Sequence, residues 1–497
     1  MARAEKTDSK RAKSPSRSFF KSAPAHIMAP RLMVGLSTFA LVVLGLVMVY
    51  SSSSITAFVE QGDSTGEAIK QCAFVIVGLI FAVLAILFGK HEVLRGFGGT
   101  VFWAICVALL VLTALLGTVG LGAKRWLIIG PISIQISEFA KIAFVLMAAR
   151  IAEDYREGAI DLYTAAKQAF VYIVLPLGFL FGAQSDLGTT LICCVGLVVV
   201  IALSGASGRL IAGIFVTGIV LVLIAILISS YRSDRLFNFL DPWADEQGTG
   251  YQLIHSYKAL AAGGLFGVGI GNSYEKLQYL PEAETDFIFA IIGEELGLVG
   301  ALLVVCAFLV FLRGGFLIAS QSKSMFSGLV AAGLTTMIVF QAFLNILCVI
   351  GLFPTTGKPL PFISSGGSSM ISSLLLVGIV LAISFDSHNE DEYRQRRESL
   401  HVVSTYSQPQ RQGSTVRDSA PRLSQTARPY RGGALQNSFH VIGGKSSRGG
   451  AKAENALQSS MHEQSSYSSY RNSAYGGSPV STSAYAMESR FHRVSRR

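Results

Sequence analysis

Ten apolar stretches follow one another along residues 32–385 of this 497-residue chain, and they constrain its fold more than any other feature. A helix crosses the hydrocarbon core of a bilayer with about twenty predominantly apolar residues. Charged residues make up only 14% of the sequence, against roughly 25% in soluble domains, which excludes a soluble enzyme with a single buried core. The sequence therefore predicts an all-α polytopic membrane protein with ten transmembrane helices, at residues 32–50, 72–89, 101–120, 137–152, 168–184, 187–204, 209–230, 286–312, 326–352 and 364–385.

The formal net charge of +10 is concentrated at the two ends of the chain. Residues 1–31 carry +6 and residues 386–497 carry +7, which leaves −3 for the segment between them. Basic segments of membrane proteins favour the cytoplasmic side, where they contact anionic lipid. Because ten spans place both ends on one side, we predict a multi-pass protein of the plasma membrane with both termini in the cytoplasm. Membrane lipids are its predicted partners, and nucleic acid is not.

Three segments flank or interrupt the predicted bundle. Residues 1–31 form a basic cytoplasmic segment, and the apolar run after it is longer than a signal-peptide core, which favours an uncleaved anchor. Residues 231–285, between the seventh and eighth spans, predict a large extracytoplasmic loop with short helices at the membrane surface. Residues 386–497 are rich in Ser and lack apolar periodicity, which predicts a disordered cytoplasmic tail. That tail either binds cytoplasmic proteins, presents phosphorylation sites or is dispensable.

Sequence motifs for common cofactors and metals are absent. The chain has no Walker A sequence, no H-E-x-x-H and no G-x-S-x-G, and the glycines of residues 267–271 are not part of a βαβ unit. The six cysteines lie in or beside apolar runs without zinc-type spacing. The sequence therefore predicts no metal site and identifies no cofactor, and a divalent-cation requirement stays open.

Ionisable side chains at or inside a membrane are costly, so they mark candidate functional residues. Lys124, Arg125 and Trp126 lie on the predicted outer side, where basic residues are disfavoured. An anionic substrate at the outer leaflet would explain a basic pair in this place.

The segment that follows adds four more candidates near the same surface. Gln135, Glu138 and Lys141 open the fourth predicted span. Glu138 and Lys141 are three residues apart on a helix, so they either contact substrate or pair with each other. Asp186 lies in a short outer turn, where it either caps the next helix or contacts substrate.

The end of the large loop carries the strongest candidate for acid–base chemistry. Asp286 is the last polar residue before a long apolar helix, and Lys276, Glu282 and Thr285 precede it. Partial desolvation should raise the pKa of Asp286 toward the range in which a general base works. The alternative is that Asp286 only caps the helix.

A fourth candidate group lies before the last span. Lys358 precedes a run of small residues, Ser364-Ser365-Gly366-Gly367-Ser368-Ser369, of which Ser365 is a candidate contact. Small residues permit either close helix packing or the close approach of a ligand.

Five motifs in these groups closely resemble the SEDS family, which includes FtsW, RodA and SpoVE, over about residues 32–385. The segments 271–277 and 292–297 are more similar to FtsW than to RodA. The matching motifs are Gly-Ala-Lys-Arg-Trp (122–126), Gln-Ile-Ser-Glu-Phe-Ala-Lys (135–141), Gln-Ser-Asp-Leu-Gly-Thr (184–189), Tyr-Leu-Pro-Glu-Ala-Glu-Thr-Asp-Phe-Ile-Phe-Ala (279–290) and Leu-Pro-Phe-Ile-Ser-Ser-Gly-Gly-Ser-Ser (360–369).

The resemblance implies a peptidoglycan glycosyltransferase that polymerises lipid II and releases undecaprenyl diphosphate. The family's essential acidic residue matches Asp286, which fits a general base acting on the 4-hydroxyl of the acceptor GlcNAc. The departing diphosphate needs cations, for which Lys124, Arg125, Lys276 and Lys358 are available. The resemblance also implies a class B penicillin-binding protein as partner and, through the FtsW likeness, a role with other divisome proteins at the division septum.

This chain departs from the family pattern at three positions. The family usually has Pro where Ile136 and Ser185 stand, and His where Glu284 stands. We expect the lost prolines to alter turn stiffness more than chemistry, whereas Glu284 adds a carboxylate close to Asp286.

A second hypothesis is a transporter that moves lipid II across the membrane. Its motivation is the number of spans and the charges of Glu138, Lys141, Glu294 and Glu295, which fall inside predicted spans. On a straight helix the last two would lie roughly 12 Å deeper than Asp286. No obvious inverted repeat relates the two halves of the chain, which counts against a transporter. An elongation or sporulation role, like that of RodA or SpoVE, stays an alternative to division.

Overall fold

The computed structural model describes residues 25–61, 64–120, 123–129, 132–228 and 230–399. The chain divides into two units, Met1–Thr405 and Tyr406–Arg497, and all described residues belong to the first. In chain order, the helices are α1 (Ala25–Gln61), α2 (Gly66–Phe88), α3 (His91–Arg95), α4 (Phe97–Leu116), α5 (Ser137–Arg156), α6 (Leu162–Ala169), the π-helical turn η1 (Phe170–Val174), α7 (Leu175–Gly182), α8 (Leu187–Leu203), α9 (Gly208–Ile228), α10 (Ser230–Leu240), the 3₁₀ turn η2 (Pro242–Asp245), α11 (Tyr251–Gly263), α12 (Ile288–Ser320), α13 (Met325–Val349) and α14 (Gly367–Ser399).

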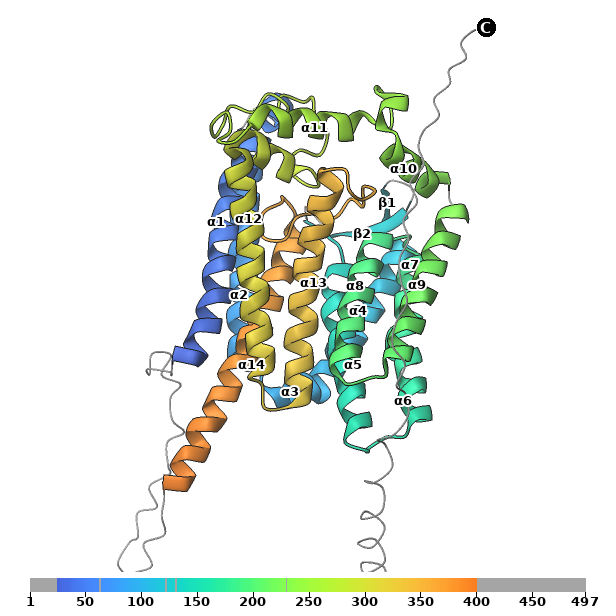
Figure 1. Ribbon diagram of the computed structural model, residues 1–497, viewed down its shortest axis with the longest axis vertical. Coiled ribbons are helices and arrows are strands. Elements are labelled where there is room, and N and C mark those ends of the chain that lie inside the picture. Colours follow the sequence, from blue (N-terminus) through green and yellow to red (C-terminus); the bar gives the residue numbers. More distant parts are fainter. Residues whose placement is uncertain (1–24, 62–63, 121–122, 130–131, 229, 400–497) are drawn as a thin grey trace, which may run out of the picture. The chain divides into compact units, whose positions relative to one another are not determined.

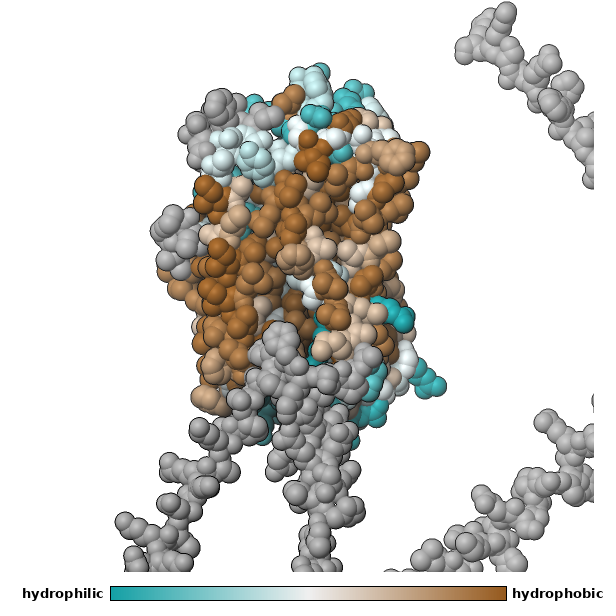
Figure 2. All heavy atoms as spheres, turned by 90° about the vertical axis from the view of Figure 1, so that its left-hand side faces the viewer, coloured by the Kyte–Doolittle hydropathy of each residue, from teal (hydrophilic) through white to brown (hydrophobic). Residues whose placement is uncertain are grey.

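The helices form a bundle, which confirms the predicted all-α polytopic membrane protein (Figure 1). α1 packs on α12, α2 on α14, and α13 on α5, α8 and α12. Hydrophobic side chains cover most of the face on the α1 and α12 side, and hydrophilic ones gather at the end that carries α11 (Figure 2). An apolar outer surface on a helix bundle is what contact with lipid requires, because lipid tails replace water there.

The predicted number of ten spans is not confirmed, although most of each of the ten apolar stretches is helical; the third, predicted to end at residue 120, leaves its helix at Leu116, and residues 118–120 form a strand. In the described part of the chain, seven helices are long and apolar enough to cross a membrane, and α8 and α9 contribute two shorter apolar ones. The seven are His26–Ser54, Gly66–Phe88, Phe97–Leu116, Leu162–Gly182, Ile288–Ser320, Met325–Val349 and Gly367–Asp386. α5 does not qualify because it is too polar, and most of its side chains are buried against neighbouring helices rather than exposed to lipid.

A small antiparallel sheet, absent from the all-α prediction, joins α4 to α5. Its strands are β1 (Thr118–Gly120), β2 (Ala123–Ile129) and β3 (Ile132–Ile134), in the order β1-β2-β3. Thr118 pairs with Trp126, and Leu127 pairs with Ile134. The sheet brings β2 and the residues after β3 to the same end of the bundle, and both carry candidate site residues.

The predicted large loop, residues 231–285, contains the expected short helices. α10, η2 and α11 lie across one end of the bundle (Figure 1). Their position at a membrane surface stays a prediction. Asp286 and Phe287 then lead from this loop into α12.

Gly297 divides α12 into two helical pieces, because its φ of 66° and ψ of −168° are not helical. The loop binds at this break: Val268 and Gly269 donate backbone hydrogen bonds to the carbonyls of Glu294 and Glu295. Both glutamates lie before the break, in the piece of α12 that starts at Ile288, so the break does not affect their depth relative to Asp286, which stays a prediction.

Helix α14 runs to Ser399, so the predicted tail boundary at residue 386 falls inside a helix. The rest of the predicted tail, residues 400–497, and most of the basic N-terminal segment, residues 1–24, lie outside the described residues.

Candidate functional site

Asp186 is the most heavily hydrogen-bonded candidate in the described part of the chain. Its side chain accepts from the backbone nitrogen of Thr189 at 3.1 Å, so it caps α8 as one interpretation predicted. It also accepts from Gln135 Nε2 at 3.0 Å and Ser137 Oγ at 3.1 Å, and Lys358 Nζ lies 2.9 Å from Oδ1. Burial opposes its ionisation, but the charges of Lys358 and Arg125 hold the pKa of Asp186 well below its usual range.

Lys358 therefore forms a buried ion pair across the bundle, with both residues almost inaccessible to solvent. The side chain runs against α8, because a methyl group at Gly188 would lie only 2.8 Å from it. Only glycine leaves room for this approach. Much of the positive charge of Lys358 is thus already balanced by Asp186.

Asp286 lies in a very different setting at the end of the large loop. The residue keeps partial exposure, whereas Phe287 and Ile288 beside it are buried. A methyl group at Gly357 would lie 3.3 Å from Asp286 Oδ2, so Gly357 is directly adjacent to the carboxylate. Burial of the carboxyl and the nearby charge of Glu282 raise the pKa of Asp286 to about 6, although Lys358 and Arg235 act in the opposite direction. The alternative that Asp286 caps α12 is not supported, because the residue before the helix is Phe287 and no side-chain cap is formed.

Hydrogen bonds join the segment around Asp286 to the segment before α14. Ser364 Oγ donates to the carbonyl of Thr285 at 2.6 Å, and the backbone nitrogen of Ser365 donates to the carbonyl of Glu284 at 2.8 Å. Thr285 Oγ1 donates to Glu282 Oε2 at 2.6 Å. The predicted candidates Glu282, Thr285 and Ser365 are therefore brought together around Asp286.

The basic motif on β2 reaches the same end of the bundle. Arg125 donates to the carbonyls of Gln184 and Ser185, at 3.1 and 2.7 Å. Trp126 is 37% exposed, and the side chain of Lys124 lies outside the described residues. Arg125 thus supports the turn that carries Asp186, and its two bonds go to neutral backbone groups.

At two of the three positions that depart from the family pattern, the backbone conformation shows whether proline could be accommodated. Ser185 has a φ of 50°, a left-handed conformation that the ring of proline cannot adopt. Ile136 has a φ of −66°, which proline would tolerate. The turn before Asp186 therefore depends on the absence of proline, whereas the start of α5 does not.

Three predicted candidates lie apart from Asp286, in buried pairs of their own. Lys141 Nζ lies 2.8 Å from Glu138 Oε2 and donates to Gln341 Oε1 at 2.6 Å. Lys276 Nζ lies 2.8 Å from Glu295 Oε1 and 3.0 Å from Ser51 Oγ. Glu138 and Lys141 thus pair with each other, as one of the two interpretations predicted, and the charge of Lys276 is balanced by Glu295 on α12.

Sequence reasoning missed three residues beside Asp286. Arg235 on α10 donates to the carbonyl of Thr355 at 2.7 Å and lowers the pKa of Asp286 through its charge. Asn345 on α13 donates to the carbonyl of Asp286 at 2.7 Å. Gly357 has a φ of 65°. A signal existed for Asn345, because an amide inside an apolar span needs a reason.

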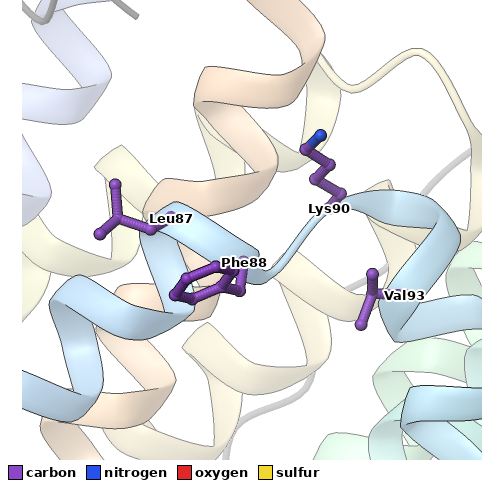
Figure 3. A pocket seen from close by; sticks show the side chains of 4 residues that line it. All are labelled: Leu87, Phe88, Lys90 and Val93. Carbon is purple, nitrogen blue, oxygen red and sulfur yellow. The ribbon is translucent and has the colours of Figure 1, made fainter.

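A shallow apolar hollow lies at the opposite end of the bundle, between α2 and α3. Figure 3 shows its lining residues, Leu87, Phe88, Lys90 and Val93, of which only Lys90 is charged. It contains none of the candidate residues. Among the described residues, no group of three His, Cys, Asp or Glu side chains could hold a metal ion.

Comparison with known proteins identifies the class to which this bundle belongs. Residues 31–389 match the family model described as cell cycle protein, FtsW/RodA/SpoVE. The chain therefore belongs to this family, which confirms the resemblance found in the motifs, and it is a multi-pass membrane protein.

Individual relatives cover nearly the whole membrane part. The chain is 36% identical to the probable peptidoglycan glycosyltransferase FtsW of Taylorella equigenitalis, over 69% of this chain and 95% of the relative. It is also 36% identical to the stage V sporulation protein E of Bacillus subtilis, over 72% and 97%.

Solved structures share the fold. A chain from a peptidoglycan synthase complex that coordinates polymerization and crosslinking superposes with a TM-score of 0.58 at 28% identity, covering 71% of this chain and 97% of that one. The rod shape determining protein RodA of Thermus thermophilus superposes with a TM-score of 0.53 at 24% identity, covering 72% and 97%.

Proposed function

We propose that this protein is a peptidoglycan glycosyltransferase that joins lipid II disaccharides into glycan strands. The observation that carries the proposal is Asp286, a residue that keeps partial exposure and whose largely desolvated carboxyl has a pKa raised to about 6, in a chain of this family. A general base works best when its pKa lies near the working pH, because it must be ionised and still hold a proton well. Relatives bearing the name peptidoglycan glycosyltransferase supply the substrate class.

In the proposed reaction, Asp286 accepts the proton of the acceptor GlcNAc 4-hydroxyl. The oxygen forms a bond to the anomeric carbon of a lipid-linked MurNAc, and the bond from that carbon to the diphosphate breaks. Undecaprenyl diphosphate leaves with the electron pair. No second carboxylic acid is needed, because diphosphate is already a good leaving group.

The candidate cations differ in how well they could stabilise the departing diphosphate. Lys276 and Lys358 are each paired with a buried carboxylate. The bonds that Arg125 makes go to backbone carbonyls, and Arg235 is close enough to influence Asp286. We assign the main electrostatic role to Arg125 and Arg235, with Lys124 as a further candidate and Lys358 as an indirect contributor.

The proposed setting is septal cell-wall synthesis during division, with Asp286 on the extracytoplasmic side and both termini in the cytoplasm. The relative named FtsW and the segments 271–277 and 292–297, which are more similar to FtsW than to RodA, support this choice over elongation. A class B penicillin-binding protein is the proposed transpeptidase partner, supported by the similarity to a chain of a synthase complex. Other divisome proteins are proposed to bind the tail, which deletion of residues 400–497 would test through septal localisation.

The transporter hypothesis loses much of its motivation. Glu138 and Lys141 pair with each other, Glu295 pairs with Lys276, and Glu294 accepts from Ser273 and Tyr274. A transport path needs charges that meet the cargo, whereas these four serve the fold.

The test is polymerisation of labelled lipid II by the purified protein with its transpeptidase partner, comparing wild type with Asp286→Asn. We expect glycan ladders from the wild type and a loss of about 10²- to 10⁴-fold in the variant, the usual contribution of a general base. Full activity of Asp286→Asn would refute the assigned base. Translocation of lipid II in liposomes without polymerisation would support the transporter instead.

A further inference from the structure

The side-chain amide of Asn345 on α13 connects the segment that carries Asp286 with the segment that carries Lys358. Asn345 Nδ2 donates to the carbonyl of Asp286 at 2.7 Å and to the carbonyl of Lys358 at 2.8 Å. Asn345 is 2% exposed, so water does not compete for these bonds. The two acceptors come from different loops, 59 residues and 13 residues away from Asn345 in the sequence.

We infer that Asn345 is a positioning residue for the transfer reaction, holding the backbone of Asp286 at a fixed place relative to Lys358. This inference rests on the proposed function, because it concerns the base of that reaction. Asn345 acts through these two backbone carbonyls and has no assigned contact with substrate.

The two loops need such a support because their own backbone structure is irregular. Asp286 lies just before α12, in a segment of turns. Residues 353–360 form neither helix nor strand, and Gly357 next to Lys358 has a φ of 65°. A base displaced by about 1 Å can lose on the order of 100-fold in rate, so fixing these segments has a direct catalytic consequence.

The hydrogen bonds of the Asn345 side chain indicate why an amide stands at this position: its nitrogen is needed as a donor. Its Oδ1 is buried and has no hydrogen-bond partner. A buried acceptor without a hydrogen-bond partner lowers stability. An amide that carries this cost inside a span is explained by the two bonds its nitrogen makes.

A second side-chain amide on α13, that of Gln341, lies one helical turn before Asn345 and binds the same loop but not Asp286. Gln341 Nε2 donates to the carbonyl of Pro359 at 3.0 Å, and its Oε1 accepts from Lys141. Gln341 and Asn345 therefore hold consecutive carbonyls of the same loop. Of these two amides, only Asn345 also reaches Asp286.

The test compares Asn345→Leu with Thr335→Val in the full-length protein bound to its transpeptidase partner. Leucine has a similar size but no donor, whereas Thr335 is a buried α13 residue whose hydroxyl has no partner. We expect Asn345→Leu to lower kcat for lipid II polymerisation by about 10- to 100-fold with KM within about twofold. Thr335→Val should keep the wild-type kcat.

The pH profile adds a readout that a purely structural role would not change. Lys358 lowers the pKa of Asp286, so a carboxylate released from its place beside Lys358 should need a higher pH to ionise. We expect the acid limb of kcat/KM in Asn345→Leu to move to higher pH. Asn345→Ser, which keeps one donor, should show a smaller shift and a smaller loss of kcat, and it replaces the leucine variant if that variant does not fold.

Three results for Asn345→Leu would overturn the inference. The first is a wild-type kcat, and the second is an effect on KM alone. The third is an acid limb of kcat/KM that does not move, together with a loss of activity no larger than the fraction of unfolded protein. If Asp286→Asn is inactive while Asn345→Leu is fully active, the inference alone fails. If Asp286→Asn is itself fully active, the assigned base fails and takes the ground of the inference with it; if the wild type does not polymerise lipid II, the proposed function fails.

Discussion

Asp186 and Asp286 are two aspartates in short turns before helices, yet their surroundings have opposite effects on a proton. Asp186 accepts hydrogen bonds from Gln135, Ser137, Thr189 and Lys358, and its pKa is held well below the usual range. Asp286 is desolvated beside another carboxylate, and its pKa is raised to about 6. The first is a permanently charged structural group, and the second is the one that can exchange a proton near neutral pH. Environments that separate two carboxylates in this way often assign their roles in catalysis.

The largest expected effect comes from removing the charge of Asp186, the structural aspartate. Asp186→Asn leaves the Lys358 ammonium buried without a counter-charge, so we expect a loss of about 3–5 kcal/mol in the free energy of unfolding. Thermal unfolding of the purified protein in detergent measures it. The double variant Asp186→Asn, Lys358→Met should recover part of the loss, because no unpaired charge remains. Equal stability of the single variant and wild type would show that the pair is not structural.

A smaller effect is expected from crowding the carboxylate of Asp286, the proposed base. Gly357→Ala places a methyl group 3.3 Å from Asp286 Oδ2 at a residue with φ of 65°. The left-handed conformation alone costs about 1–2 kcal/mol for alanine, and we expect kcat to fall several-fold. Gly158→Ala, which has the same left-handed conformation at φ of 72° but whose methyl group would meet open space, is the matched control: it should lower stability by a similar amount and leave kcat unchanged. A neutral Gly357→Ala would show that this contact does not restrain Asp286.

The smallest effect is a change in pH dependence. The charge of Glu282 raises the pKa of Asp286. Glu282→Gln removes that charge, so Asp286 should ionise at lower pH and the acid limb of kcat/KM should move down. Glu246→Gln, an exposed change on the same loop, is the control. A limb that stays in place or moves up would contradict the electrostatic coupling.

The sequence predicted those parts of this comparison that depend on local pattern. The apolar stretches predicted the helices, and the position of Asp286 before a long apolar run predicted partial desolvation. Motifs predicted the family. What could not be predicted was the partner of a charge that lies far away in the sequence, because Asp186 and Lys358 are 172 residues apart and meet only in the packed bundle.

The break of α12 at Gly297 is one of the features that the sequence did not reveal. A single glycine inside an apolar run is tolerated in a helix, so periodicity alone favours a continuous one. The bonds from Val268 and Gly269 to α12 form across the loop and leave no local signal. For the same reason Asn345 was overlooked, since the carbonyls that it binds belong to distant residues.

The most direct test of the central claim is the pH dependence of lipid II polymerisation by wild type and by Asp286→Asn. A base must be ionised to accept a proton, so wild-type kcat/KM should rise with pH and reach half its plateau near the raised pKa of Asp286, about 6. The residual activity of Asp286→Asn should show no such limb. If the same limb persists in the variant, another group titrates, and Asp286 is not the base.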